Sequence, residues 1–223
     1  MTLEGKRVRT VIFDMDCVVI HSEYLYDLAD TELLRRRGKI FEREKVISQI
    51  VGKEFSEGTQ LLKDVFGLQD DIPILVKERR EILENLYATK LQFIECFPEF
   101  HTALMKLGIA TCIATASADD ILITVENLLG ISRFFGDNIY KISDVGNKSK
   151  PSPAIFVHAA QQMSTPLDEC VVIEDSPNGI RAAKNAAIRC VAITTTHEKE
   201  KLSEADVIVN TFSDIDLSNF SNQ

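Results

Sequence analysis

The sequence predicts an α/β fold, in which a Rossmann-like parallel sheet flanked by helices carries an inserted α-helical cap domain. Two observations predict it. From about residue 99 onward, short apolar runs alternate with amphipathic segments, which is the pattern of βαβ units around a parallel sheet. Earlier, an apolar run at residues 8–13 is followed by a long stretch with helical periodicity and no convincing strand, which indicates a helical insert.

The first strand is expected at residues 8–13, because Val11-Ile12-Phe13 is continuously apolar and lies between basic residues and acids. Such a run is typical of a strand that is buried on both faces. In the insert, Ser22 is a suitable N-cap for the first helix, and Gly38 suits the position just after its end. Helices of the insert are expected at residues 23–37, 45–51, 56–66 and 73–91.

The alternating pattern resumes at Phe97-Pro98. Further strands are expected at residues 109–115, 139–142, 170–174, 190–193 and 207–209, and helices at residues 99–107, 119–129, 154–163 and 179–187. These elements assign residues 1–18 and 97–223 to the core and residues 19–96 to the cap. We expect the cap to act as a lid hinged at its two connections, with a purely structural helical layer as the alternative.

Composition and charge exclude several function classes. The net charge of −9 over 223 residues argues against nucleic-acid or anionic-membrane binding, but it allows a small anionic substrate. Five cysteines without a C-x-x-C pair indicate a reducing compartment rather than a disulfide framework or a zinc site. There is no apolar leader and no stretch near the ~20 apolar residues of a membrane helix, so we expect a cytoplasmic protein. We also expect a monomer, with an oligomer not excluded.

Two carboxylates, Asp14 and Asp16, directly follow the first predicted strand. Buried carboxylates are costly unless a cation or a reaction uses them. In open α/β sheets, ligands bind at the carboxyl ends of the strands. The pair therefore indicates a functional site at that edge, although Asp is also common in solvated turns.

Three later segments end in side chains suited to the same chemistry. Thr115-Ala116-Ser117 offers a hydroxyl and open backbone N–H groups before a helix, which favours an anion, although such hydroxyls are usually N-caps. Lys150 lies before another helix, where it can be a point charge for phosphate or a solvated lysine. Glu174-Asp175 again places two acids after a buried strand. Two pairs of acids at one edge favour a hard cation between them, and Mg²⁺ fits.

The sequence resembles the haloacid dehalogenase-like (HAD) hydrolase superfamily, in particular its phosphoglycolate phosphatase and β-phosphoglucomutase-like branch, over nearly its whole length. The matching stretches are FDMDCVVIHSE, IATCIATAS, KSKPSPAIF and VVIEDSPNGIRAAKNA, in the family's order. The resemblance implies a Mg²⁺-dependent phosphatase that acts through an aspartyl-phosphate on a small organic phosphomonoester, such as a sugar phosphate.

The resemblance also implies a role for each matching residue. Asp14 would be the nucleophile, and Asp16 the general acid and base. Thr115 and Lys150 would stabilise the transferring phosphoryl group, with help from the backbone near Ala116 and Ser117. The metal site would comprise Asp14, Asp16 through its backbone carbonyl, Glu174 and Asp175.

The sequence departs from the family pattern at several positions. Cys17 and Ala187 stand where glycine is usual, and His21 stands where aspartate is common. Glycine adopts backbone conformations that other residues enter at a cost, so Cys17 is expected to affect turnover. In the cap, which is expected to select the substrate, Lys53 is the nearest cation to a substrate-binding position, with a solvated lysine as the alternative.

Three other readings compete with the phosphatase. A β-phosphoglucomutase-like mutase would carry a histidine at the position of Tyr26 and an arginine near Phe55, and both are missing. A dehalogenase needs neither Asp16 nor the second pair of acids. A phospho-accepting receiver would lack the helical insert, so the stronger non-enzyme reading is an inactive family member that binds phosphate. Simple hydrolysis is favoured over all three.

Overall fold

The computed structural model describes residues 7–50 and 55–220. The chain divides into two compact units, one made of residues 1–21 and 92–223 and the other of residues 22–91. The predicted boundaries lay at 18/19 and 96/97. The difference arises because the two connecting segments pair with each other.

In that pairing, the His21 N–H donates to the Gln92 carbonyl at 2.9 Å, and the Ile94 N–H donates to the Val19 carbonyl at 3.0 Å. Each segment thereby satisfies backbone groups of the other. Both segments therefore belong to the first unit rather than to the helical insert.

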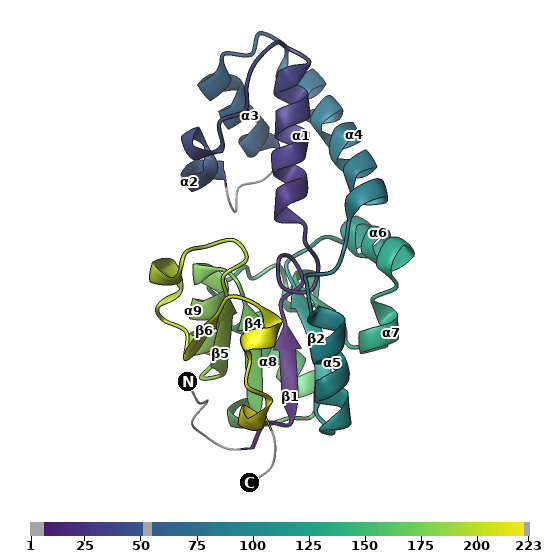
Figure 1. The fold of residues 1–223 in the computed structure, drawn as a ribbon, viewed down its shortest axis with the longest axis vertical. Coiled ribbons are helices and arrows are strands. Elements are labelled where there is room, and N and C mark those ends of the chain that lie inside the picture. The colour runs from purple at the N-terminus through teal and green to yellow at the C-terminus, as the bar shows by residue number, and fades with distance from the viewer. Residues whose placement is uncertain (1–6, 51–54, 221–223) are drawn as a thin grey trace. The chain divides into compact units, whose positions relative to one another are not determined.

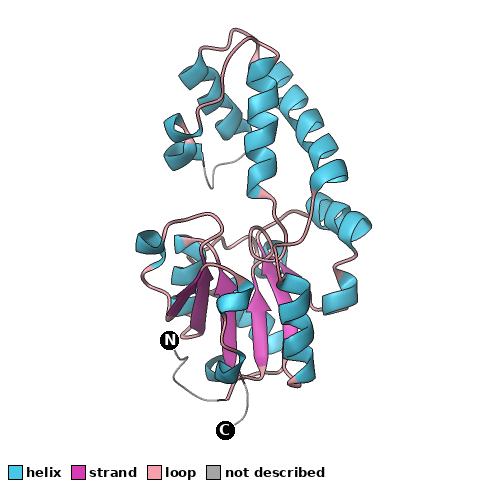
Figure 2. Ribbon diagram, in the orientation of Figure 1, coloured by secondary structure: helices cyan, strands magenta, loops and turns pink. Residues whose placement is uncertain are grey.

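Within the described residues of the first unit, six parallel strands form one sheet in the order β3-β2-β1-β4-β5-β6. Figure 2 shows the strands of this sheet in magenta and the helices of the unit in cyan. The strands are β1 (Thr10–Phe13), β2 (Ala110–Thr115), β3 (Ile139–Lys141), β4 (Cys170–Glu174), β5 (Arg189–Ile193) and β6 (Val207–Val209). The helices of this unit are α5 (Phe97–Lys106), α6 (Asp119–Leu129), α7 (Ser132–Phe135), α8 (Ala154–Gln162) and α9 (Pro177–Asn185) (Figure 1). The predicted fold class is therefore confirmed. Among the described residues of this unit, α7 is the one α-helix that the sequence pattern missed, apart from short 3-10 helices.

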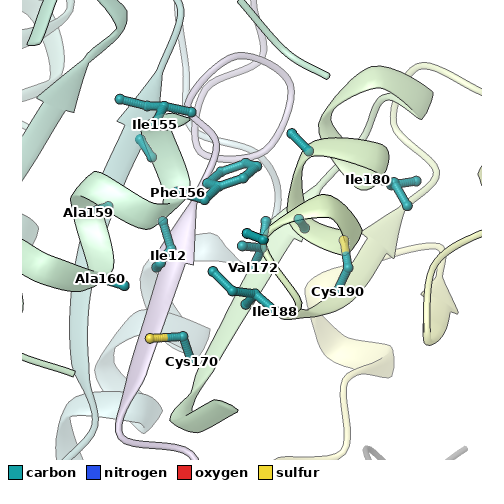
Figure 3. Packing of buried hydrophobic residues seen from close by; sticks show 14 of the residues in the cluster. Ile12, Ile155, Phe156, Ala159, Ala160, Cys170, Val172, Ile180, Ile188 and Cys190 are labelled. Atoms are coloured by element: carbon teal, nitrogen blue, oxygen red, sulfur yellow. The ribbon is translucent and has the colours of Figure 1, made fainter. Parts of the chain in front are cut away.

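Neighbouring residues of β1 pack on opposite faces of the sheet, as the pleat requires. Ile12 lies in an apolar cluster with α8 and α9, which includes the fully buried Phe156 (Figure 3). Phe13 faces the other way and makes edge-to-face contacts with Phe97 of α5 and Phe135 of α7, both at 5.7 Å between ring centroids. The central strand is thus buried on both sides, which explains its continuous apolar run.

The strand order creates a switch point at β1, where successive connections leave in opposite directions. Phe13 pairs with Ile113 of β2 on one side and with Ile173 of β4 on the other. Residues at the ends of β1 and β4 are therefore neighbours at the edge where open α/β sheets bind ligands. Asp14 directly follows β1, and Glu174 is the last residue of β4.

A left-handed residue, Ala187, follows the end of helix α9. Ala187 has φ +56°, and the N–H groups of Ala187 and Ile188 donate to the carbonyls of Lys184 and Ala183, which closes the last turn. Such a position favours glycine, because a Cβ in the left-handed region costs roughly 1–2 kcal/mol. This conformation explains why glycine is usual at this position in the family that the sequence resembles.

We expect Ala187→Gly to raise the free energy of unfolding by roughly 0.5–1 kcal/mol, since the relief of strain exceeds the extra entropy that glycine gives the unfolded chain. Ala187 is exposed, so no packing is lost. Because the chain has no tryptophan, urea unfolding followed by far-UV circular dichroism measures the difference. An unchanged or lower midpoint would contradict it.

The second unit consists of helices. They are α1 (Glu23–Arg35), α2 (Ile47–Ile50), α3 (Phe55–Phe66) and α4 (Ile72–Lys90). Helix α1 packs along α4, and a fully enclosed ion pair joins them: Arg79 Nε donates to Asp30 Oδ1 at 2.6 Å, and Nη2 donates to Oδ2 at 3.1 Å. The Arg79 guanidinium also reaches the Thr59 hydroxyl at 3.3 Å and lies over the Phe55 ring.

We expect Asp30→Ala to destabilise this unit by about 3–5 kcal/mol, because it leaves the buried Arg79 charge without its partner. Thermal and urea unfolding measure the loss. Glu32→Ala is the matched control, since Glu32 pairs with Arg35 and Arg36 on the surface, where ion pairs contribute little. Equal effects of the two substitutions would contradict a special role for the buried pair.

Within residues 7–50 and 55–220, no helix has both the length and the apolar character needed to cross a bilayer. All five cysteines are free thiols.

Candidate active site

The site is built around Asp14, which directly follows β1. Its backbone N–H donates to the Ile173 carbonyl of β4 at 3.0 Å, so the pairing of the two strands continues to this residue. Its side chain is only 10% exposed. The fold thus places a nearly buried carboxylate at the switch point of the sheet.

Lys150 reaches this carboxylate from the loop before α8. Its Nζ forms a short hydrogen bond to Asp14 Oδ1 and another to Glu174 Oε1 at 2.6 Å. The ammonium also lies 4.9 Å from the centroid of the Phe156 ring. Phe156 is anchored in the apolar cluster of Figure 3, so the lysine is held by two carboxylates and an aromatic face.

Glu174 is the last residue of β4, and its side chain is saturated by protein donors. Oε2 accepts hydrogen bonds from the N–H groups of Asp175 and Ser176, each at 2.9 Å, and from the Ser176 hydroxyl at 3.0 Å. Ser176 also caps α9 by accepting from the Gly179 N–H at 3.1 Å. One carboxylate therefore joins β4, the start of α9 and Lys150.

Gly179 is required by this arrangement for steric reasons. A Cβ on Gly179 would lie 1.7 Å from Glu174 Oε1, the oxygen that accepts from Lys150. No atom fits at that distance, so either the Glu174 carboxylate or the first turn of α9 would have to move. The absence of a side chain at Gly179 thus allows Glu174 to hold Lys150 in its position.

We expect Gly179→Ala to lower kcat by about 100-fold, because displacing Lys150 by an ångström disturbs the catalytic geometry. Asn178→Ala, one residue earlier and exposed, is the control. Initial rates of the hydrolysis that the resemblance implies measure both. Near-native kcat in folded Gly179→Ala protein would show that Glu174 is not needed to hold the lysine.

Asp175 is also nearly buried and is held from the loop after β5. The Thr196 hydroxyl contacts Asp175 Oδ2 in a short hydrogen bond, and its distance to the Asp175 carbonyl is 3.2 Å. The preceding Thr195 hydroxyl donates to the Cys17 carbonyl at 2.6 Å. Cys17 has φ +59°, which is the left-handed conformation that explains why glycine is usual there.

Asp16 and the end of β2 form the other side of the site. The Ser117 hydroxyl makes a short hydrogen bond to Asp16 Oδ2, and the Ser117 N–H donates to the Thr115 hydroxyl oxygen at 2.9 Å. The Ser117 backbone is therefore engaged within its own loop, and Thr115 is almost fully buried.

Negative charge exceeds positive charge in this site. Burial, together with Glu174 and Asp16, raises the pKa of Asp14 to about 7, and Lys150 offsets only part of this. Burial and the nearby Glu174 and Asp14 carboxylates raise the pKa of Asp175 well above its ordinary value. Burial alone would lower the pKa of Lys150, but the two carboxylates outweigh it and raise that pKa.

This imbalance fits a divalent cation. A single ammonium accompanies the buried Asp14, Glu174 and Asp175 carboxylates and the half-buried Asp16, and oxygen donors are what Mg²⁺ prefers. Over the part of the chain that the structure describes, no three His, Cys, Asp or Glu side chains already have metal-binding geometry. A Mg²⁺ ion here would therefore be held by the Asp14 and Asp175 carboxylates together with a backbone oxygen and water, as is common for Mg²⁺ sites.

The structure brings together most of the side chains that the sequence singled out. Asp14, Lys150 and Glu174 are in direct contact, Asp175 adjoins Glu174, and Ser117 joins Asp16 to Thr115. Ala116 lies exposed between Thr115 and Ser117. Lys53 lies outside the described residues.

Sequence reasoning missed four residues that shape the site: Thr195, Thr196, Phe156 and the steric role of Gly179. For the threonines a signal was present, because three consecutive hydroxyl residues follow the buried strand β5, next to β4. Phe156 and Gly179 carried no such signal, since an apolar helix residue and a glycine in a helix have many other uses.

A family model described as haloacid dehalogenase-like hydrolase matches residues 8–187. The chain is 34% identical over 206 residues to the protein SUPPRESSOR OF QUENCHING 1, chloroplastic, of Arabidopsis thaliana, covering 89% of this chain but 19% of that protein's length. It is 27% identical over 224 residues to validoxylamine A 7'-phosphate phosphatase of Streptomyces hygroscopicus subsp. limoneus, covering 93% and 95% of the two chains.

Among solved structures, a HAD family hydrolase from Deinococcus radiodurans R1 with bound phosphate and sodium has the same fold. It superposes with a TM-score of 0.82 at 23% identity, covering 95% of this chain and 94% of the other.

Proposed function

Because the chain belongs to the haloacid dehalogenase-like hydrolases, we propose that it releases phosphate from a small organic phosphomonoester through an aspartyl-phosphate on Asp14, with Mg²⁺ as its cofactor. That it is a phosphoric monoester hydrolase of small phosphorylated molecules follows from the family and from the phosphatase that it matches over nearly its full length. The aspartyl-phosphate, the metal and the substrate class are the finer points of the proposal.

The contact between Lys150 and Asp14 carries the proposal. A phosphate monoester dianion repels a carboxylate nucleophile, so a cation must already be beside that carboxylate. The ammonium bridging Asp14 and Glu174 is such a cation, and its three hydrogen-bond donors leave one for a phosphoryl oxygen.

The reaction divides into two displacements. An Asp14 carboxylate oxygen attacks phosphorus while the bond from phosphorus to the ester oxygen breaks, and Asp16 gives its proton to the departing alkoxide. Asp16, now ionised, takes a proton from water as that water attacks the aspartyl-phosphate. Inorganic phosphate leaves and Asp14 is regenerated. Lys150 and the Thr115 hydroxyl meet the charge on the phosphoryl oxygens.

Asp14, the Asp16 backbone carbonyl and Asp175 would hold Mg²⁺. The resemblance implies Glu174 as a further ligand. Since its oxygens already accept from Lys150 and from the start of α9, we propose that it supports the metal site through these contacts. When bound, the ion offsets the repulsion between the substrate dianion and the nucleophile. Lys53 of the cap is proposed to contact the substrate, and a sugar phosphate or a similar small polar molecule is the proposed class.

A phosphosugar mutase is the second candidate, because it would use the same core residues. Tyr26 stands where a mutase of the resembling branch carries histidine, and Phe55 lies near the position where it carries arginine. In the structure, the Phe55 ring packs against the guanidinium groups of Arg79 and Arg80, with 4.7 and 4.9 Å to the ring centroid. Those arginines are thus engaged within the helical unit, which favours hydrolysis.

The proposal is tested by measuring phosphate release from a panel of small phosphomonoesters, with Mg²⁺ and with chelator. Release that requires Mg²⁺ is expected for at least one ester. Interconversion of a sugar phosphate in the presence of a sugar bisphosphate, without phosphate release, would establish the mutase instead. No turnover and bound phosphate would indicate an inactive family member.

A further inference from the structure

The segment after β5 contains a hydroxyl group placed to control Asp175. Strand β5 is hydrogen-bonded to β4, with Glu174 paired to Ala192, so the residues that follow β5 lie beside the acidic end of β4. Thr196 lies in that segment and contacts Oδ2 of Asp175. The two residues are 21 positions apart in the sequence, so their contact results from the pairing of the strands and not from closeness along the chain.

The contact differs in kind from the other hydrogen bonds of the segment. The Thr194 hydroxyl reaches Asn210 Oδ1 at 3.2 Å, on the surface and away from the acids. The Thr196 hydroxyl instead points to one carboxylate oxygen of Asp175, a residue that is only 7% exposed. Within the described residues, no hydrogen-bond donor contacts the other oxygen, Oδ1 of Asp175.

We propose that Thr196 is a positioning residue for Asp175: its hydroxyl fixes Oδ2 and thereby presents Oδ1 to the Mg²⁺ ion. The inference rests on the proposed function, because it assigns Asp175 to the metal site. A carboxylate held at one oxygen has lost its rotational freedom before the ion arrives, so binding does not have to order it. Partners of this kind orient metal-ligating carboxylates, and their loss typically weakens metal affinity about 10–100-fold.

The test uses three variants: Thr196→Val, which keeps the shape of the side chain but removes the hydroxyl; Thr196→Ser, which keeps the hydroxyl; and Thr194→Val, the same change at a position without contact to the acids. The readout is binding of Mn²⁺, as a spectroscopic probe for the Mg²⁺ site, to each full-length protein without substrate. Free Mn²⁺ is followed by electron paramagnetic resonance, with Mg²⁺ as competitor.

Thr196→Val is expected to bind Mn²⁺ about 10–100-fold more weakly than the unmodified protein. Thr196→Ser should recover most of that loss, and Thr194→Val should show none. Saturating Mg²⁺ should restore much of the kcat of Thr196→Val, because the residue acts on metal binding and not on the reacting atoms. Unfolding temperatures in chelator should agree among the variants.

Native Mn²⁺ affinity in Thr196→Val, or an equal loss in Thr194→Val, would overturn the positioning role. Should Thr196→Val not fold, Thr196→Ala against Thr196→Ser decides by the same criterion. If the unmodified protein itself binds no Mn²⁺, the proposed metal site fails, which is a separate result from tight binding that Thr196→Val leaves unchanged.

Discussion

Replacing Asp14 with asparagine is expected to lower phosphate release by about 10,000-fold or more, the scale of loss when an enzyme loses its nucleophile. The amide has nearly the shape of the carboxylate, but its oxygen does not form the phosphoryl intermediate. Single-turnover and steady-state rates with the best ester of the panel measure the effect. Residual activity within tenfold of the unmodified protein would remove Asp14 from the role of nucleophile.

Loss of activity in Asp14→Asn should not come from unfolding. Burial raises the pKa of Asp14 from 3.8 to about 7, so ionising it costs the folded state more than the unfolded chain. As pH rises from 3.8 through 7, ionisation of Asp14 progressively lowers the stability of the unmodified protein, and above pH 7 this destabilisation is complete. In chelator at pH 8, Asp14→Asn is therefore expected to unfold at the same or a higher temperature, with a smaller pH dependence between these values.

Replacing Lys150 with methionine is expected to lower kcat by about 100–1,000-fold, as is usual when a group that stabilises transition-state charge is removed. The change leaves Asp14 and Glu174 without their shared cation. Because Lys150 lowers the pKa of Asp14, its loss raises that pKa in the metal-free protein. Methionine keeps a flexible apolar chain against the Phe156 ring. The measurement is kcat and KM across pH at saturating Mg²⁺.

Lys148→Met is the matched control, since Lys148 is an exposed lysine two residues earlier in the same loop. It should leave kcat within about twofold, the size of effect usual for surface changes. If Lys148→Met and Lys150→Met lose activity equally, the loss reflects the net charge of the loop rather than the contact with Asp14.

The sequence predicted the core of this protein well because two physical constraints coincide there. A strand buried on both faces must be continuously apolar, so β1 and β4 were located to within two residues. Asp14 and Glu174 end those strands, and the strand order that makes them neighbours is the usual one for a sheet that binds ligands at its switch point. Their proximity in the structure follows from that pairing.

Other features depend on side-chain geometry that no sequence pattern specifies. The contact between Thr196 and Asp175 requires the exact reach of the segment after β5, and the need for Gly179 appears only once Glu174 is in place. The helical unit spans residues 22–91, three to five residues inside the limits predicted for the cap, because the pairing of His21 with Gln92 joins segments that are far apart along the chain.

The most direct test of the account is to stop the reaction with acid within its first turnovers and analyse the peptide that contains Asp14 by mass spectrometry. The account predicts that this peptide gains the mass of one phosphoryl group, that hydroxylamine removes it, and that Asp14→Asn protein never acquires it. Rapid phosphate release with an unmodified Asp14 peptide at every time point would mean that water attacks the substrate directly, and it would contradict the aspartyl-phosphate mechanism.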